Sequence, residues 1–245
     1  MKCILIITFC FISNAFIAVS LFAQNEALIR TKFRVMPVQS AKWTGIYYKP
    51  EVNAPMQELK FQSLSRSFNR YSYYGVNPII FYRENGRNDD GELTYKEVGK
   101  TSISNNQTLI IFVPNAANNL SEFNLISLDD SPKGLPNNHL SFINITGIQL
   151  ACRFLEKNQF LKPGLTGPIS LQEAINENVF IGLAIQDGDR ARVILKNNWY
   201  FYTGNRHLIL LLPPKKPGSY KIQAYRISEF VGENKEFYTN SVSKP

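Results

Sequence analysis

The sequence predicts an all-β protein made of two consecutive antiparallel β-sandwich domains of the immunoglobulin-like type. Aromatic residues make up 13% of the chain, with 12 Tyr and 17 Phe, and aromatic and β-branched side chains are typical of strands. Short apolar or alternating segments follow one another along the chain, and the breaks between them hold the Asn, Gly, Pro and Asp residues of turns. Strands that are this short and this regularly spaced favour a sandwich or a barrel.

The N-terminal segment has the pattern of a secretory signal. Lys2 precedes an almost unbroken apolar run from Cys3 to Phe22, and the small residue Ala23 stands before a polar junction. We therefore assign residues 1–23 to a signal peptide and expect a secreted protein, located in the periplasm or at the cell surface. The apolar run is also long enough to cross a bilayer as a helix. An uncleaved N-terminal anchor is the alternative, and only that form would contact a membrane.

The first predicted domain covers residues 24–135. Its expected strands are Lys32–Val38, Thr44–Lys49, Gln57–Gln62, Arg70–Tyr74, Pro78–Arg83, Leu93–Val98, Thr108–Val113 and Glu122–Leu128. Gly86–Gly91 has the composition of a hairpin turn between two of these strands. The turn-rich segment Ser131–Asn138 marks the boundary with the following domain.

The second predicted domain covers residues 136–232, and a polar tail over residues 233–245 follows it. Its expected strands are Leu140–Ile145, Gln149–Leu155, Phe180–Gln186, Ala191–Leu195, Trp199–Tyr202, His207–Leu212 and Ser219–Ile227. Asp187–Asp189 reads as a second hairpin turn. Helical character is confined to Ile169–Asn178, a segment short enough to make a marginal helix.

Segments of the two halves resemble each other, which predicts a duplication of one β-domain. Thr108–Pro114 resembles His207–Pro213, because both are apolar strands that end in a proline, where strand pairing stops. The alternative is that any two strand–turn–strand segments look alike. The other matching pairs are Leu59–Ser65 with Leu140–Thr146, Pro78-Ile-Ile-Phe with Phe180-Ile-Gly-Leu, and Phe123–Leu128 with Tyr220–Tyr225.

A family resemblance is carried by three segments around the middle of the chain. Ile126–Pro136, Leu140–Thr146 and Pro163-Gly164 together resemble a group of secreted, β-rich bacterial proteins of unassigned function. The resemblance covers most of the chain that follows the signal segment. It implies a periplasmic or surface setting, and it implies no particular activity or catalytic residue.

Charge and cysteine content restrict the function further. The formal net charge is +8, and the 27 Lys and Arg residues are scattered through the chain. In a secreted protein this charge favours solubility or attraction to anionic envelope glycans, and no nucleic-acid motif supports a nucleic-acid partner. Only Cys152 remains after the signal segment, so we expect no internal disulfide and interpret this cysteine as a small buried apolar residue.

Motifs of catalysis and cofactor binding are scarce. The two histidines, His139 and His207, have no second His or Cys at metal-ligand spacing. The sequence also lacks a Gly-x-Ser-x-Gly elbow and a phosphate-binding glycine loop. We therefore predict a protein without a metal, a cofactor or catalytic residues. A glycan-acting enzyme, which needs two carboxylates facing each other across its substrate, is the third alternative.

Aromatic side chains supply the remaining functional signal. Exposed rings on a β-sandwich can stack against sugars, whereas buried rings fill the core. When two tyrosines are adjacent in a strand, one of them must face outward. The sequence thus predicts a binding or structural protein of the bacterial cell envelope whose partner is an envelope protein or a glycan, with a carbohydrate-binding module as the alternative. The candidate glycan-binding residues are Trp43, Tyr47, Tyr48, Tyr71, Tyr73 and Tyr74.

Overall fold

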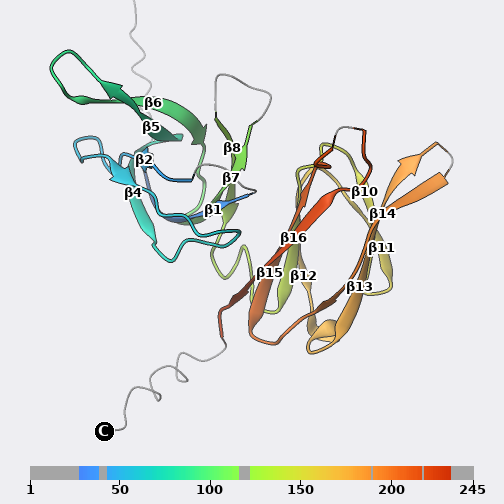
Figure 1. Ribbon diagram of the computed structural model, residues 1–245. Helices are drawn as coiled ribbons and strands as arrows, with labels where there is room; N and C mark the ends of the chain where they lie inside the picture. The colour runs from blue at the N-terminus through green and yellow to red at the C-terminus, as the bar shows by residue number, and fades with distance from the viewer. Residues whose placement is uncertain (1–27, 39–42, 116–121, 189, 217, 233–245) are drawn as a thin grey trace, which may run out of the picture.

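The structure is nearly all β, which confirms the fold class (Figure 1). The predicted signal peptide and polar tail lie outside the residues that the structure describes. Among the described residues, no helix has the length and apolar character needed to span a membrane. The computed structural model describes residues 28–38, 43–115, 122–188, 190–216 and 218–232.

The first sandwich is formed by strands β1 to β8. These strands are β1 (Leu28–Pro37), β2 (Ile46–Tyr48), β3 (Gln57–Glu58), β4 (Tyr71–Val76), β5 (Ile79–Arg87), β6 (Leu93–Thr101), β7 (Gln107–Pro114) and β8 (Phe123–Asp129). They form one sheet in the order β4-β1-β7-β8 and a second in the order β3-β2-β5-β6. All neighbouring strands are antiparallel except β1 and β7, which are parallel.

The second sandwich is formed by strands β9 to β16. These strands are β9 (His139–Asn144), β10 (Leu150–Phe154), β11 (Lys157–Leu161), β12 (Gly164–Ser170), β13 (Asn178–Asp187), β14 (Arg190–Tyr200), β15 (Asn205–Leu212) and β16 (Gln223–Phe230). A short 3₁₀ turn, η1 (Gln172–Ala174), precedes β13. The sheet orders are β12-β9-β15-β16 and β11-β10-β13-β14, and β9 is parallel to β15.

Both sandwiches have the same topology, which supports the predicted duplication. Each strand of the first sandwich corresponds to the strand eight places later, so β7 matches β15 and β5 matches β13. The sequence match at Leu59 is wrong, because Leu59 follows β3 whereas Leu140 belongs to β9, the counterpart of β1. The match for β8 needs a shift of two residues, since Leu128 pairs with Leu109 and Ile227 pairs with Leu208.

The strand order does not confirm the immunoglobulin-like part of the prediction. In immunoglobulin domains the first strand pairs with the second, in a sheet ordered ABED. Here β1 pairs with β4 and β7, and β9 pairs with β12 and β15. The molecule is therefore an all-β protein of two sandwiches whose connectivity differs from the immunoglobulin order.

Four elements of the second sandwich differ from the prediction. Lys157–Leu161 forms β11, and Gly164–Ser170 forms β12, although neither was predicted to be a strand. The expected helix over Ile169–Asn178 is instead the end of β12, the turn η1 and the start of β13. The two strands expected over 191–202 are one continuous strand, β14. The polar residues in its middle face solvent, so they do not interrupt the strand.

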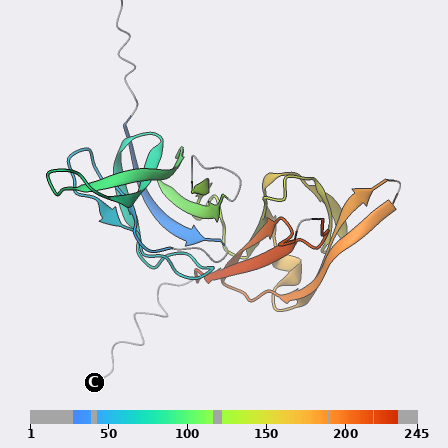
Figure 2. The same ribbon diagram turned by 45° about the horizontal axis from the view of Figure 1, so that its top comes forward.

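The four sheets stack as four layers with three apolar cores between them (Figures 1 and 2). We call β3-β2-β5-β6 and β11-β10-β13-β14 the outer sheets, and the other two the inner sheets. One core lies inside each sandwich, and the third lies between the two inner sheets. The third core consists of Met36, Val38, Leu109, Ile111, Leu128, Ile143, Leu208, Leu210, Leu212 and Ile227.

This layering explains why β7 and β15 are almost continuously apolar. In β15, Leu208, Leu210 and Leu212 face the core between the sandwiches, whereas Ile209 and Leu211 face the core of the second sandwich. The same alternation holds in β7. A strand with both faces buried is apolar at consecutive positions. The two inner sheets are thus covered on both sides, and only the outer sheets turn a whole face to solvent.

A buried cluster of charged side chains joins the two sandwiches at one end of this interface. Arg34 in β1 donates from Nε to Asp130 Oδ2 at 2.8 Å and from Nη2 to Glu229 Oε2 at 3.1 Å. Arg206 in β15 donates from Nη2 to Asp130 Oδ1 at 3.0 Å and from Nε to Glu229 Oε2 at 2.7 Å. The Nε atom of Arg66 lies 3.4 Å from both carboxylates. Three buried arginines thus surround two acids.

Two buried groups near this interface titrate far from their ordinary range. Burial alone would raise the pKa of Glu229, but the hydrogen bond from Arg34 and the charges of Arg66 and Arg206 hold it at about 2. Burial, with the charge of Arg226, lowers the pKa of His207 to about 4. The folded state therefore favours an ionised Glu229 and a neutral His207.

We expect acid to destabilise the protein in two stages. In the unfolded chain His207 becomes protonated near pH 6.5, whereas in the folded protein it stays neutral down to about pH 4. The free energy of unfolding therefore falls by about 3 kcal/mol as the pH is lowered from about 6.5 to about 4. The contribution of Glu229, about 2 kcal/mol after screening, is lost as the pH falls from about 4.5 to about 2. Urea unfolding at a series of pH values measures both stages. His207→Phe should remove the upper stage, and an unchanged profile would contradict this assignment.

Candidate functional site

Two of the six candidate aromatic residues belong to the core and cannot contact a ligand. Tyr48 is 0% exposed and Tyr71 is 3% exposed, and both rings pack against Phe33. Their hydroxyl groups are satisfied internally, since Tyr48 donates to Gln57 Oε1 at 2.8 Å and Tyr71 accepts from the backbone of Lys60 at 2.7 Å. This corrects the prediction for these two residues.

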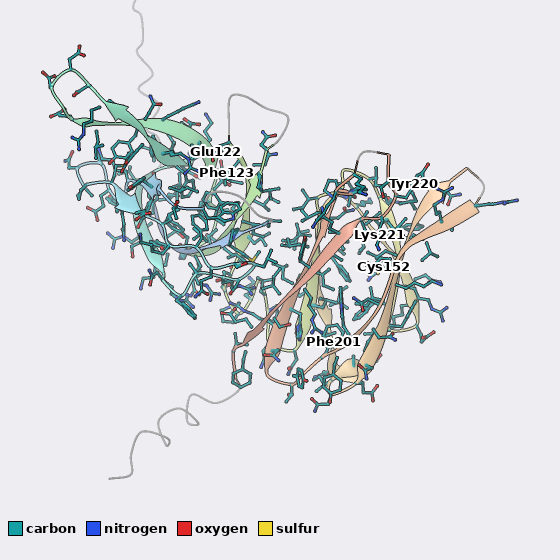
Figure 3. All side chains as sticks on the ribbon, in the orientation of Figure 1. Glu122, Phe123, Cys152, Phe201, Tyr220 and Lys221 are labelled. Carbon is teal, nitrogen blue, oxygen red and sulfur yellow. The ribbon has the colours of Figure 1, made fainter. Side chains whose placement is uncertain are left out.

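Trp43 and Tyr47 lie on different surfaces of the first sandwich. Trp43 is half-buried, and its ring stacks on Phe123 with a centroid separation of 5.2 Å (Phe123 is labelled in Figure 3). Tyr47 faces away from the core on β2 and donates its hydroxyl hydrogen to Glu84 Oε1 at 2.7 Å. That hydrogen bond is the main reason why the pKa of Tyr47 rises to about 12.

Tyr73 and Tyr74 line a groove of about 450 Å³ on the first sandwich. The groove lies between β4 and the outer sheet, where Tyr82 of β5 forms part of its lining. We call this the tyrosine groove. Tyr74 is 41% exposed, and the guanidinium of Arg30 lies 5.2 Å from the centre of its ring. The remaining lining residues are Lys49, Glu51, Val52, Gly75, Val76, Asn77, Pro78, Ile80 and Lys100.

The turn between β4 and β5 fixes the shape of the tyrosine groove. Asn77 bridges to the segment after β6, donating to the carbonyl of Ile103 at 3.0 Å and accepting from its amide at 2.9 Å. The hydroxyl of Tyr73 donates to the carbonyl of Val76 at 2.5 Å, and a Cβ on Gly75 would lie 2.7 Å from that hydroxyl. Glycine at position 75 thus leaves room for the ring of Tyr73.

Two phenols of the tyrosine groove, those of Tyr73 and Tyr82, have a raised pKa and stay protonated at physiological pH. Burial raises the pKa of Tyr73, with a smaller effect from Tyr82, and burial together with Glu97 raises the pKa of Tyr82. Lys49 and Lys100 contribute ammonium donors to the lining. The groove therefore combines apolar ring surface with neutral phenols, the cations of Lys49 and Lys100 and the acid Glu51, all of which can form hydrogen bonds to a ligand.

The aromatic surface continues from the groove across the outer sheet. Tyr82 is paired with Tyr47 on the neighbouring strand β2, and the pair is flanked by Glu58 on β3 and Glu97 on β6. Tyr95 lies edge-on to Tyr47 with a centroid separation of 5.5 Å. We call the row Glu58–Tyr47–Tyr82–Glu97 the tyrosine ridge.

The outer sheet of the second sandwich carries a hollow at the corresponding place. Its volume is about 410 Å³, and its floor is made of the small residues Ala151, Gly182 and Ala184. We call it the alanine hollow. Three exposed apolar side chains line it, Phe160 at 66%, Val193 at 52% and Phe180 at 39% exposure, together with the polar residues Arg153, Asn158, Gln159 and Lys196.

Strand register places these residues in two rows across four strands. The apolar row is Phe160–Ala151–Ala184–Val193, and the polar row beside it is Asn158–Arg153–Gly182–Lys196. The polar row is also marked by an ion pair between Arg153 and the neighbouring Glu156. A Cβ on Gly182 would lie 2.9 Å from the ring of Phe180, so glycine at this position lets that ring lie over the sheet.

Sequence reasoning missed Tyr82, Tyr95 and Phe160. The segment Phe81-Tyr82 was recognised as a strand, and alternation from the buried Phe81 would have placed Tyr82 on the outer face. Phe160 belongs to β11, which was not predicted, so its exposed ring had no expected partner. The signal for Tyr95 is weaker, because it depends on the pairing of β5 with β6.

The groups that commonly carry catalysis are buried or far apart in the described residues. Cys152 lies in the core of the second sandwich with Phe201 (both labelled in Figure 3), and burial raises its pKa to about 11, so its thiol is not activated. His207 is buried against Phe201 and contacts Ser228 Oγ at 2.8 Å through Nδ1. His139 contacts the carbonyl of Asn137. No group of three potential metal ligands occurs within the parts of the chain that the structure describes.

No protein-family model matches this chain, and no curated protein matches it.

Proposed function

We propose that this is a secreted, non-enzymatic binding protein of the bacterial cell envelope, and that the tyrosine groove is its ligand-binding site. The observation that carries the proposal is the grouping of Tyr73, Tyr74 and Tyr82 in one groove with Lys49 and Lys100. A concave apolar surface with a few convergent polar groups is the usual form of a ligand site. The secretory pattern of residues 1–23 supports a location outside the cytoplasm.

A glycan is the ligand that this groove favours. Tyrosine rings present a flat apolar face to the C–H groups of a sugar, while phenol and ammonium groups can form hydrogen bonds to its hydroxyl or carboxylate oxygens. The two lysines also favour a glycan that carries negative charge. An apolar peptide would use the rings but would offer no negative charge to Lys49 and Lys100.

Co-sedimentation with peptidoglycan and a panel of insoluble polysaccharides tests the proposal. We expect binding to one glycan that persists at high salt, because ring stacking is not screened by ions whereas purely electrostatic attraction is. Tyr74→Ala should weaken this binding by about tenfold or more and leave the unfolding midpoint nearly unchanged, since Tyr74 is 41% exposed.

Tyr202→Ala is the matched control. Tyr202 is 60% exposed and lies 4.6 Å from the ring of Tyr200 in the second sandwich, outside the tyrosine groove. We expect this variant to bind like the parent protein. Equal losses in both variants, or binding that high salt removes completely, would contradict a glycan site in the tyrosine groove.

A further inference from the structure

We propose that copies of this protein associate head to tail, with the tyrosine ridge of one copy seated in the alanine hollow of the next. The inference concerns the outer sheets, and it goes beyond the ligand proposed for the tyrosine groove. The inner sheets pack against each other, so the two outer sheets lie at opposite ends of the four-layer stack (Figures 1 and 2). A contact between opposite ends of identical molecules is heterologous, and it repeats along a chain of copies.

The ridge and the hollow occupy corresponding positions in the two sandwiches. Tyr47 pairs with Tyr82 just as Ala151 pairs with Ala184, and each pair joins the second and fifth strands of its sandwich. Each outer sheet also has a β-bulge in the strand that pairs with the fifth strand. The bulge lies at Val98 in β6 and at Ile194 in β14, at the same position relative to the two pairs. The same place in the fold therefore carries two large rings in one sandwich and two methyl groups in the other.

The two surfaces differ in side-chain size. The ridge carries two tyrosine rings that are only partly buried, and the hollow offers about 410 Å³ above small residues. Phe160 and Val193 end the apolar row of the hollow and are more than half exposed. Large apolar side chains gathered on one face are typical of an interaction surface, and covering them with the tyrosine rings removes this area from water.

The charges beside the two surfaces are also complementary. Glu58 and Glu97 flank the tyrosines of the ridge, whereas Arg153 and Lys196 flank Gly182 in the polar row of the hollow. These groups already have partners within the chain, since Lys60 pairs with Glu58, Lys100 lies 3.9 Å from Glu97 and Arg153 pairs with Glu156. Because these existing ion pairs reduce what the charges can add to affinity, the charges mainly orient the contact. Burial of apolar surface supplies most of its free energy.

Mixing two variants tests the head-to-tail geometry. Tyr47→Ala removes half of the ridge and leaves the hollow intact, whereas Ala184→Trp fills the hollow and leaves the ridge intact. Sedimentation velocity of the purified protein without the signal segment (residues 24–245), from micromolar to millimolar concentration, should show self-association of the parent protein. We expect each variant alone to associate at least about tenfold more weakly. An equimolar mixture should form dimers, because one intact ridge meets one intact hollow, and it should form nothing larger.

Further variants keep the test decisive if either protein folds poorly. Glu97→Lys replaces the ridge variant and Ala151→Trp replaces the hollow variant, and matching circular dichroism spectra establish that the folds are intact. A parent protein that stays monomeric at all these concentrations would overturn the proposal. So would a mixture that contains no more dimer than either variant alone, or a Tyr47→Ala protein that associates as strongly as the parent. Tyr82 belongs to both surfaces, but Tyr47 does not line the tyrosine groove, so Tyr47→Ala tests self-association without removing a residue of the glycan site.

Discussion

Replacing Asp130 with asparagine lowers the free energy of unfolding by about 3 to 5 kcal/mol, because removal of one partner leaves buried charges uncompensated. Asp130 is 3% exposed and accepts hydrogen bonds from Arg34 and Arg206. In its absence three buried guanidinium groups face one carboxylate, that of Glu229. Urea unfolding at neutral pH, followed by circular dichroism, measures the loss.

Glu156→Gln provides the control for this prediction. Glu156 pairs with Arg153 on the surface, where its side chain is 79% exposed, so the substitution should change the free energy of unfolding by less than about 1 kcal/mol. If Asp130→Asn cost no more than Glu156→Gln, the charged cluster would not stabilise the joint between the sandwiches.

Truncating Leu210 to alanine costs about 2 to 5 kcal/mol and leaves unfolding a single transition. Leu210 is fully buried in the core between the two inner sheets, so the substitution removes apolar contacts and opens a cavity. Because this core is shared, neither sandwich can unfold without exposing the inner face of the other. Calorimetry and urea unfolding should both show one cooperative transition in the parent and in the variant.

Leu165→Ala is the matched control, since Leu165 in β12 is 51% exposed and its truncation should cost less than about 1 kcal/mol. The shared core also predicts that the parent protein unfolds in a single transition. Two separate transitions in the parent protein would mean that the sandwiches are stable independently. In that case the apolar contacts between them would contribute little to folding.

Much of the fold could be predicted from local patterns. Turn residues and alternation located most strands of the first sandwich, and the apolar runs of β7 and β15 revealed the correspondence between the two halves. The strands that were missed lack such patterns. β11 begins with three polar residues at the edge of its sheet, and β12 contains Gly164, Gly167 and Pro168, which are rare in strand interiors. Pairing with β10 and β9 overrides these weak propensities.

The binding surfaces were less predictable, because strand register decides them. Adjacent tyrosines showed that one ring of each pair had to face outward, but not which one, and the structure buries Tyr48 while exposing part of Tyr47. Tyr82 lines the tyrosine groove together with the turn residue Asn77, and it belongs to the ridge because it pairs with Tyr47. Both contacts connect segments that are distant in the sequence, and no local pattern contains them.

Amide hydrogen exchange in the presence of soluble peptidoglycan fragments tests the central claim, that the tyrosine groove is the ligand-binding site. We expect the fragments to slow exchange at the amides of β4 and of Asn77, which line the groove, and to leave the second sandwich unchanged. The same measurement on Tyr74→Ala should show no such protection at equal fragment concentration. Protection confined to β13 and β14, or absent from β4 at saturating fragment concentration, would contradict the account.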